Sequence, residues 1–239
     1  HLRQMKILAI ETSCDETAIA VLDCRGSIKN PSFKVLSNVI SSQIKIHAKW
    51  GGVVPNLAKR EHIKNLPLVF KKALREASAP GRPALGWKDI DTVAITTGPG
   101  LEPALWTGIN FTQSLIQKQP KPVVAVNHME GHLVDSILSG KQKVRFPALA
   151  LLVSGGHTEL VLIKDWMDYK IIGETLDDAA GEAFDKIAKM LGLAYPGGPI
   201  VSKLASEHIP DPLLLKQFPK IIFPRPMINS KNYNFSFSG

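Results

Sequence analysis

Two stretches of this chain repeat one pattern: LAIETSCDETAIAV at residues 8–21 and LLVSGGHTELVL at residues 151–162. Each begins with an apolar run suited to one buried strand and then turns through small polar residues that end on a threonine, Thr17 or Thr158. A second apolar run follows in both, so each stretch predicts a β-hairpin. A further β-type segment and a helical segment come after each hairpin. The pattern therefore predicts two copies of one supersecondary unit.

The repeat indicates an α/β protein built from two duplicated domains. Two mixed-sheet units that each direct a hairpin turn into a shared cleft describe the actin-like ATPase (ASKHA) fold. We place the boundary in the stretch 141–147, which gives an N-terminal domain at 1–143 and a C-terminal domain at 144–239. The second half has no further strand–helix stretch to match the first, so we expect that domain to be incomplete. Chance similarity of two hairpins is the alternative.

Hydrophobic periodicity and turn residues divide the chain into alternating strands and helices. The expected strands are 6–11, 17–23, 34–40, 92–97, 123–126, the two runs of the second hairpin, and 169–173. The expected helices are 57–77, 103–117, 128–138, 178–191 and 200–207. Pro67 interrupts the first helix and marks a candidate kink. The expected core stripe of the helix 178–191 consists of Ala180, Phe184, Ile187 and Leu191.

Composition favours a globular protein of a reducing compartment. The 239 residues are 44% hydrophobic, and no apolar run approaches the roughly 20 residues of a membrane span. The two cysteines, Cys14 and Cys24, are too few for a disulfide framework. We therefore expect a cytoplasmic protein without a signal peptide, without membrane contact, and with both thiols packed as small hydrophobes.

The charge is basic and organised. A net charge of +8 and a pI near 9.5 favour a polyanionic partner. On the helix 57–77, four basic side chains fall within roughly 60° of one face. These are Arg60, Lys64, Lys71 and Arg75. They are candidates for nucleic-acid contact, and a solvated basic face is the simpler alternative.

His128 and His132 are spaced to hold one metal ion. At i and i+4 they lie about 40° apart on one helix face. Zinc peptidases of the H-E-x-x-H type carry their general base directly after the first histidine. Here the acid is Glu130, about 200° around the helix from the histidine face, so peptidase chemistry is disfavoured. Asp135 returns to that face as a third ligand, a partner of a ligand, or a solvated acid.

Three carboxylates suggest a place for a hydroxylated ligand. Asp178, Glu182 and Asp185 lie at i, i+4 and i+7 of the helix 178–191. Stacked carboxylates repel one another, so they require a cation, water or a hydroxyl between them, and a ribose offers two hydroxyls. A solvated acidic face is the alternative.

Two turns and one acidic pair add further candidates. The bare backbone N–H groups of Gly155 and Gly156 can bind an anion. The stretch 196–199, Pro-Gly-Gly-Pro, permits close backbone approach to a flat ring. Asp15 and Glu16 in the first hairpin turn are either an acid/base pair or polar turn residues. Two histidines that can bind one metal ion, together with a turn that can bind an anion, indicate a nucleotide-like substrate.

Seven motifs, in order along nearly the whole chain, resemble the tRNA threonylcarbamoyladenosine transferase family. They are Glu11–Thr17, Gly51–Pro55, Gly98–Leu101, Asn127–His132, Val153–Thr158, Asp177–Lys186 and Tyr195–Pro199. The Met129-Glu130 pair between the two histidines resembles the bacterial and organellar branch. The sequence departs from the family at Glu102–Trp106 and at Ser202, where an acid is common.

The resemblance implies an actin-like fold and a divalent metal, iron or zinc, held by His128 and His132. It implies transfer of threonylcarbamoyl from threonylcarbamoyl-AMP to the exocyclic amine of the adenosine beside the anticodon of tRNA, with release of AMP. Implied adenylate contacts are Leu152, Val153, Ser154, Gly155, Gly156, Asp185 and Gly198.

The resemblance also implies partners besides tRNA. These are an inactive paralogous subunit and a small P-loop ATPase. Two rival functions stay open at this point. One is an actin-like ATPase or phosphotransferase that has no role on tRNA. The other is a non-enzymatic paralogue that supports an active subunit, and the retained histidine pair argues against it.

Overall fold

The computed structural model describes residues 4–27, 30–78, 81, 83–138, 144–207 and 222–239. The chain divides into two compact units, His1–Ser139 and Gly140–Gly239. The predicted boundary between 143 and 144 adjoins residues 139–143, which lie outside the described residues. Among the residues described, no helix is both long enough and apolar enough to cross a bilayer.

The first unit is built on a five-stranded mixed sheet. Its strands are β1 (Met5–Glu11), β2 (Glu16–Ser27), β3 (Asn30–Ser42), β4 (Thr92–Gly98) and β5 (Val123–Asn127). They are arranged in the order β3-β2-β1-β4-β5. The first three form an antiparallel meander, and β4 and β5 run parallel to β1. The predicted hairpin is therefore present, with strands longer than the sequence pattern indicated.

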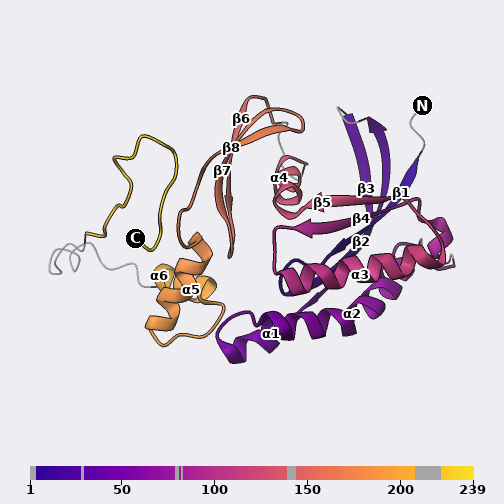
Figure 1. The fold of residues 1–239 in the computed structure, drawn as a ribbon, viewed down its shortest axis with the longest axis horizontal. Helices are drawn as coiled ribbons and strands as arrows, with labels where there is room; N and C mark the ends of the chain where they lie inside the picture. Colours follow the sequence, from indigo (N-terminus) through magenta and orange to yellow (C-terminus); the bar gives the residue numbers. More distant parts are fainter. Residues whose placement is uncertain (1–3, 28–29, 79–80, 82, 139–143, 208–221) are drawn as a thin grey trace. The chain divides into compact units, whose positions relative to one another are not determined.

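Helices α2 (Pro55–Glu76) and α3 (Glu102–Lys118) lie together on one side of this sheet (Figure 1). Alternation along the strands directs every second apolar side chain of β1 and β2 toward them. The resulting core contains Leu8, Ile10, Ile19, Val21, Leu66, Val69, Ala73, Val93 and Ile95, among others. Helix α2 continues through Pro67 as one element, so the proline does not divide it.

Two shorter helices place site residues at the end of the sheet. Helix α1 (Ile44–His47) and the 3-10 turn Ala48–Trp50 connect β3 to α2, and a second 3-10 turn, Trp87–Asp89, precedes β4. Helix α4 (His128–Leu138) follows β5 without an intervening loop. Its bounds match the sequence prediction for 128–138.

The second unit repeats the start of the first. Strands β6 (Ala148–Val153), β7 (Thr158–Asp165) and β8 (Asp168–Glu174) form an antiparallel meander in the order β6-β7-β8. Helices α5 (Ala180–Met190) and α6 (Gly197–Glu207) follow. The succession of three meander strands and a helix is that of β1, β2, β3 and α2, which confirms the duplicated α/β class predicted from the hairpin repeat.

The predicted core stripe of α5 is wrong. Phe184 is 44% exposed, Ile187 is 47% exposed and Leu191 is 65% exposed, whereas Ala188 is buried. Ala188 packs against Gly197, where an added Cβ would lie 2.3 Å from the alanine methyl. Hydrophobic periodicity showed which side of the helix is apolar, but it could not show which side is covered by a neighbouring element. Among the described residues of this unit, helix α6 packs against α5 at Ala188.

Two neighbouring leucines of α2 test the core assignment. Leu66 is 1% exposed and Leu68 is 61% exposed, on either side of Pro67. We expect Leu66→Ala to lower the free energy of unfolding by about 2–5 kcal/mol, because it leaves a cavity in the core. Leu68→Ala, the matched control, should change it by less than about 0.5 kcal/mol. Urea titration followed by circular dichroism measures both, and equal losses would contradict the assignment.

Candidate functional site

The two histidines of α4 are fixed at the start of that helix. The side-chain Oδ1 of Asn127 accepts the backbone N–H groups of Met129 at 2.8 Å and Glu130 at 3.2 Å. This bond pattern is that of an N-cap, so Asn127 sets where α4 begins and which face the histidines occupy. Met129 and Leu133 are buried and anchor the adjacent side of the helix, about 100° from the histidines.

The imidazoles of His128 and His132 converge. Their Nε2 atoms lie 3.1 Å apart, with the ring planes at 85°. Nitrogen ligands about 2.0–2.1 Å from one tetrahedral ion lie roughly 3.3 Å from each other. The pair therefore fits two coordination positions of one ion, in agreement with the spacing argument.

Behind His128 lies Glu11, at the end of the central strand β1. The His128 Nδ1 atom is 3.2 Å from the Glu11 Oε2 atom and 3.2 Å from the Ser13 Oγ atom. A carboxylate on the far nitrogen of a histidine orients the ring and strengthens it as a metal ligand. Sequence reasoning gave Glu11 no separate role, because 117 residues separate the two partners.

Glu11 and His128 each stabilise the charged form of the other. Burial by itself raises the pKa of Glu11, but hydrogen bonds with His128, Ser13 and Thr96 outweigh it and lower that pKa to about 2. The hydrogen bond and charge of Glu11 raise the pKa of His128, against the opposing effect of burial. Glu11 is thus ionised at neutral pH and holds the N–H of the His128 Nδ1 atom.

No third metal ligand joins the pair in the described part of the chain. No group of three His, Cys, Asp or Glu side chains there has a geometry suited to an ion. Asp135 is exposed and is not brought into such a group. Within the described residues, the two histidines are therefore the candidate ligands that the structure brings together.

The two acidic candidates of the first unit are Asp15, the last residue of the β1–β2 loop, and Glu16, the first residue of β2. Both are half-buried, and Glu16 accepts a 3.1 Å hydrogen bond from the Ser42 hydroxyl. Burial raises the pKa of Glu16, and the charge of Asp15 raises it further. The Ser13 hydroxyl of this loop lies 3.2 Å from the His128 Nδ1 atom, so the loop that leads to the acidic pair also contacts the histidine pair.

Cys14 lies in the same loop, and its surroundings disfavour the thiolate form. Burial, and then the neighbouring Asp15 carboxylate, raise the pKa of its thiol to about 12. The thiolate is the reactive form of cysteine, so a thiol that stays protonated at neutral pH is inert.

The second unit presents the Gly-Gly turn between β6 and β7. The backbone N–H of Ser154 donates to the His157 carbonyl at 2.9 Å, and the Ser154 hydroxyl accepts the His157 N–H at 3.0 Å. Gly155 and Gly156 are exposed, and no described backbone hydrogen bond uses their N–H groups. The turn is closed by Ser154 and leaves two donors open, as an anion site requires.

The N-terminus of α5 lies against this turn. The Gly181 N–H donates to the Ser154 carbonyl at 3.2 Å, and a Cβ on Gly181 would come within 2.8 Å of that oxygen. The Ala180 N–H donates to the Thr158 hydroxyl at 3.0 Å. A helix N-terminus adds positive potential, which favours an anion at the turn. Sequence reasoning missed Gly181, whose only signal was a glycine at the second position of a helix.

The predicted acidic stripe of α5 separates into two parts. Asp178 precedes the helix and is buried, and Lys186 forms ion pairs with Asp178 and, at 3.2 Å, with Glu182. The repulsion expected between stacked carboxylates is therefore relieved by a lysine. Asp185 is apart from them, and its Oδ1 accepts the Gly197 N–H at 2.7 Å at the start of α6.

The two glycines of α6 have different constraints. Gly197 has no room for a side chain, because α5 is too close, whereas a Cβ on Gly198 would meet only Phe184 at 3.8 Å. The close packing of α5 against α6 therefore explains why a glycine is needed at position 197. Of the remaining predicted contacts, Leu152 is buried and Val153 is 58% exposed at the end of β6.

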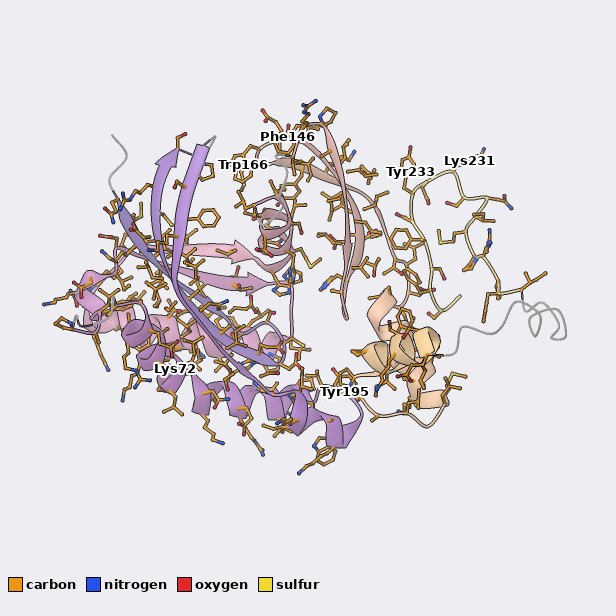
Figure 2. All side chains as sticks on the ribbon, turned by 180° about the vertical axis from the view of Figure 1, so that it is seen from behind. Lys72, Phe146, Trp166, Tyr195, Lys231 and Tyr233 are labelled. Carbon is orange, nitrogen blue, oxygen red and sulfur yellow. The ribbon has the colours of Figure 1, made fainter. Side chains whose placement is uncertain are left out.

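Asp177 is a residue that sequence reasoning left without a role. Its carboxylate accepts the backbone N–H of Phe237 at 2.8 Å and the hydroxyl of Ser236. These bonds lower its pKa to about 2. Tyr233 of the same C-terminal segment (Figure 2) lies so close to Gly173 of β8 that a Cβ there would be 2.1 Å from its carbonyl oxygen.

Solved structures show only weak similarity to the chain. YeaZ from Pseudomonas aeruginosa is 15% identical, with a TM-score of 0.39 over 70% of this chain and 64% of that one. An Aquifex aeolicus PPX-GPPA enzyme is 14% identical, with a TM-score of 0.41 over 71% of this chain and 52% of that one. Neither similarity supports an inference about this chain.

Sequence comparison is decisive for the family. The TsaD family, tRNA N6-adenosine threonylcarbamoyltransferase, matches residues 34–239. Two proteins of that name, from Persephonella marina and Thermosipho melanesiensis, are each 48% identical over 98% of this chain. The chain spans 62% and 65% of their lengths. It therefore belongs to the TsaD family of tRNA N6-adenosine threonylcarbamoyltransferases.

Proposed function

We propose that the protein transfers the threonylcarbamoyl group of threonylcarbamoyl-AMP to the exocyclic amine of the adenosine beside the anticodon of tRNA, releasing AMP. Membership of the family makes this the leading reaction. The observation that supports the proposal for this chain is the histidine pair, with Nε2 atoms 3.1 Å apart and a half-buried carboxylate behind one ring. A paralogue without activity has no use for such an anchor.

His128 and His132 would hold one divalent ion, iron or zinc. Both metals accept imidazole ligands. Glu11 keeps the His128 ring oriented, and Asn127 fixes the turn of helix that carries both rings. When bound, the ion supplies a Lewis acid for oxygen atoms of the substrate.

The second unit would hold the adenylate. The open N–H groups of Gly155 and Gly156, together with the N-terminus of α5, suit its phosphate. Leu152, Val153 and Ser154 shape the start of that turn. Asp185 has one carboxylate oxygen engaged with Gly197, which leaves its other oxygen for a ribose hydroxyl. Gly198, with open space around it, suits a flat base.

The reaction is an acyl transfer from a mixed anhydride. The amine nitrogen forms a bond to the carbamoyl carbon, and the bond from that carbon to the phosphate oxygen breaks. The amine also loses a proton. We assign that proton to the pair Asp15 and Glu16, because the raised pKa of Glu16 makes its carboxylate a stronger base than an ordinary glutamate.

The macromolecular partners belong to the same proposal. Arg60, Lys64, Lys71 and Arg75 are exposed on α2 and can neutralise phosphates of tRNA. An inactive paralogous subunit, a small P-loop ATPase and a cytoplasmic location are further proposals drawn from the family resemblance. The basic stripe is also a possible contact surface for such a subunit.

Mass spectrometry of tRNA nucleosides tests the reaction. Cells that lack the complete gene should lose threonylcarbamoyladenosine, and the wild-type gene should restore it. The variant His128→Ala/His132→Ala should not restore it, and the purified variant should lose its metal by elemental analysis, because no comparable anchor remains on α4.

His157→Ala removes a histidine of the second unit, serves as the control for metal content, and should keep the metal. Restoration by the double variant with unchanged metal content would contradict the assignment of the anchor. Unchanged nucleosides in the deletion strain would instead favour the ATPase alternative.

Glu11→Gln tests whether the carboxylate behind His128 supports metal binding. We expect metal affinity to fall by roughly 10–100-fold, the usual effect of losing such a partner. The measurement is a competition titration against a chelator at alkaline pH, where protons no longer compete for the ring. Glu159→Gln, in the second unit, is the control. Equal affinities in the two variants would show that Glu11 is dispensable.

Asp185→Asn tests the adenylate site without disturbing α6. Asparagine keeps an oxygen for the Gly197 N–H but loses the charge that strengthens a bond to ribose. A hydrogen bond to a charged group contributes about 1.5–3 kcal/mol, so AMP affinity should fall by roughly ten- to a hundredfold. Asp178→Asn should lower thermal stability but leave AMP affinity nearly unchanged, because Asp178 is buried against Lys186. Calorimetry that gives equal affinities for both variants would refute the ribose contact.

A further inference from the structure

Three consecutive carbonyl groups of the β1–β2 loop are each held by a different part of the first unit. The Ser13 carbonyl accepts the Leu101 N–H at 2.7 Å, and the Asp15 carbonyl accepts the Gln43 N–H at 2.9 Å. Between them, the Cys14 carbonyl is 3.0 Å from the Nε2 atom of His62 on α2. The middle bond is the only one of these three that is made by a side chain.

The hydrogen bonds of His62 fix its tautomer. A carbonyl oxygen can only accept, so the Nε2 atom carries the hydrogen and donates it to Cys14. The Nδ1 atom is then the acceptor, and it lies 2.8 Å from the hydroxyl of Thr17. Burial lowers the pKa of His62, which favours the neutral ring that this pattern requires.

His62 thus binds both flanks of the acidic pair. Cys14 precedes Asp15, and Thr17 follows Glu16, so one imidazole joins the two ends of that dipeptide. His62 and Thr17 are both fully buried. A rigid ring between these points limits the movement of Asp15 and Glu16 relative to α2.

Further buried polar groups support the ring. The Gln43 amide nitrogen is 3.4 Å from the Nδ1 atom of His62, and its oxygen accepts the Nε2–H of His47 at 3.0 Å. The Nδ1 atom of His47 in turn accepts the N–H of Val54, which precedes α2. Both histidines and the glutamine are fully buried. Every link has its partner, as a buried polar network requires if it is to stabilise the fold.

We propose that His62 is a positioning residue for the acyl transfer: it holds the loop of Asp15 and Glu16 in its reactive geometry without touching substrate. This assignment rests on the proposed function of Asp15 and Glu16. A misplacement of about 1 Å at a reacting group lowers a rate by on the order of a hundredfold. A merely structural histidine would affect stability and leave the rate of the folded enzyme alone.

Two conservative variants of His62 separate these roles. In His62→Gln, the side-chain amide reaches the position of the Nε2 atom and can still donate to the Cys14 carbonyl. In His62→Asn, the shorter amide reaches only the position of the Nδ1 atom, so it can bond Thr17 but not Cys14. Both variants bury one amide, which makes them matched in polarity. Ser37→Ala, which loses a buried 2.8 Å bond to the Ala73 carbonyl away from the loop, is the stability control.

Steady-state kinetics of the complete protein with tRNA and threonylcarbamoyl-AMP is the first measurement. We expect kcat of His62→Asn to fall by on the order of a hundredfold with KM for tRNA unchanged. His62→Gln should stay within about threefold of the wild type, which corresponds to less than about 0.7 kcal/mol. Ser37→Ala should keep wild-type kcat. Equal kcat in the Gln and Asn variants, or a loss matched by Ser37→Ala, overturns the proposal.

The carbonyl carbon shift of Cys14, read by NMR, is the second measurement and needs no enzymatic activity. The shift of the hydrogen-bonded carbonyl should persist in His62→Gln and be lost in His62→Asn. A wild-type protein that modifies no tRNA refutes the proposed function, whereas the carbonyl shift still decides whether His62 holds the loop. A Cys14 shift unchanged in both variants overturns the assignment of His62.

Discussion

The first unit depends on a short loop that is held from all sides. Ser13, Cys14 and Asp15 each have their carbonyl bonded to a separate segment, and Gly100 lies so close that a Cβ would come within 2.6 Å of the Ser13 carbonyl oxygen. This loop contacts His128 through Ser13 and leads directly into the acidic pair of Asp15 and Glu16. The strands and helices of the unit hold the loop in place, and the loop connects the histidine pair to the acid/base candidates.

The two hairpin turns use one scaffold for opposite electrostatic tasks. In the first unit, the end of β1 places the Glu11 carboxylate behind the His128 ring, which suits a cation. In the second unit Gly155 and Gly156 leave backbone N–H groups open beside the N-terminus of α5, which suits an anion. A duplicated hairpin can serve both purposes because strand pairing fixes the backbone path, while the turn residues and the helix beside each turn set the sign of the local field.

Buried polar groups give the first unit its specificity of geometry. The chain from His62 through Gln43 to His47 is fully paired, so it adds directional bonds without leaving desolvated groups unsatisfied. In the second unit, Lys186 forms ion pairs with Asp178 and Glu182, although the second carboxylate oxygen of Asp178 is buried without a hydrogen-bond partner among the described residues. In both places, polar residues that look solvated in the sequence are bound to particular partners.

The spacing of residues along the sequence was enough to predict much of the fold and part of the candidate site. Alternation predicted the hairpins, and helical periodicity placed His128 and His132 on one face of a helix whose bounds it also predicted. The partners of those residues were decided by tertiary structure, because Glu11 meets His128 across 117 residues and His62 meets Cys14 across 48. Helix α5 shows the opposite outcome: the sequence predicted a buried apolar face, and that face is exposed in the structure. Sequence periodicity reports which side of an element is apolar, but only the packed chain determines what that side meets.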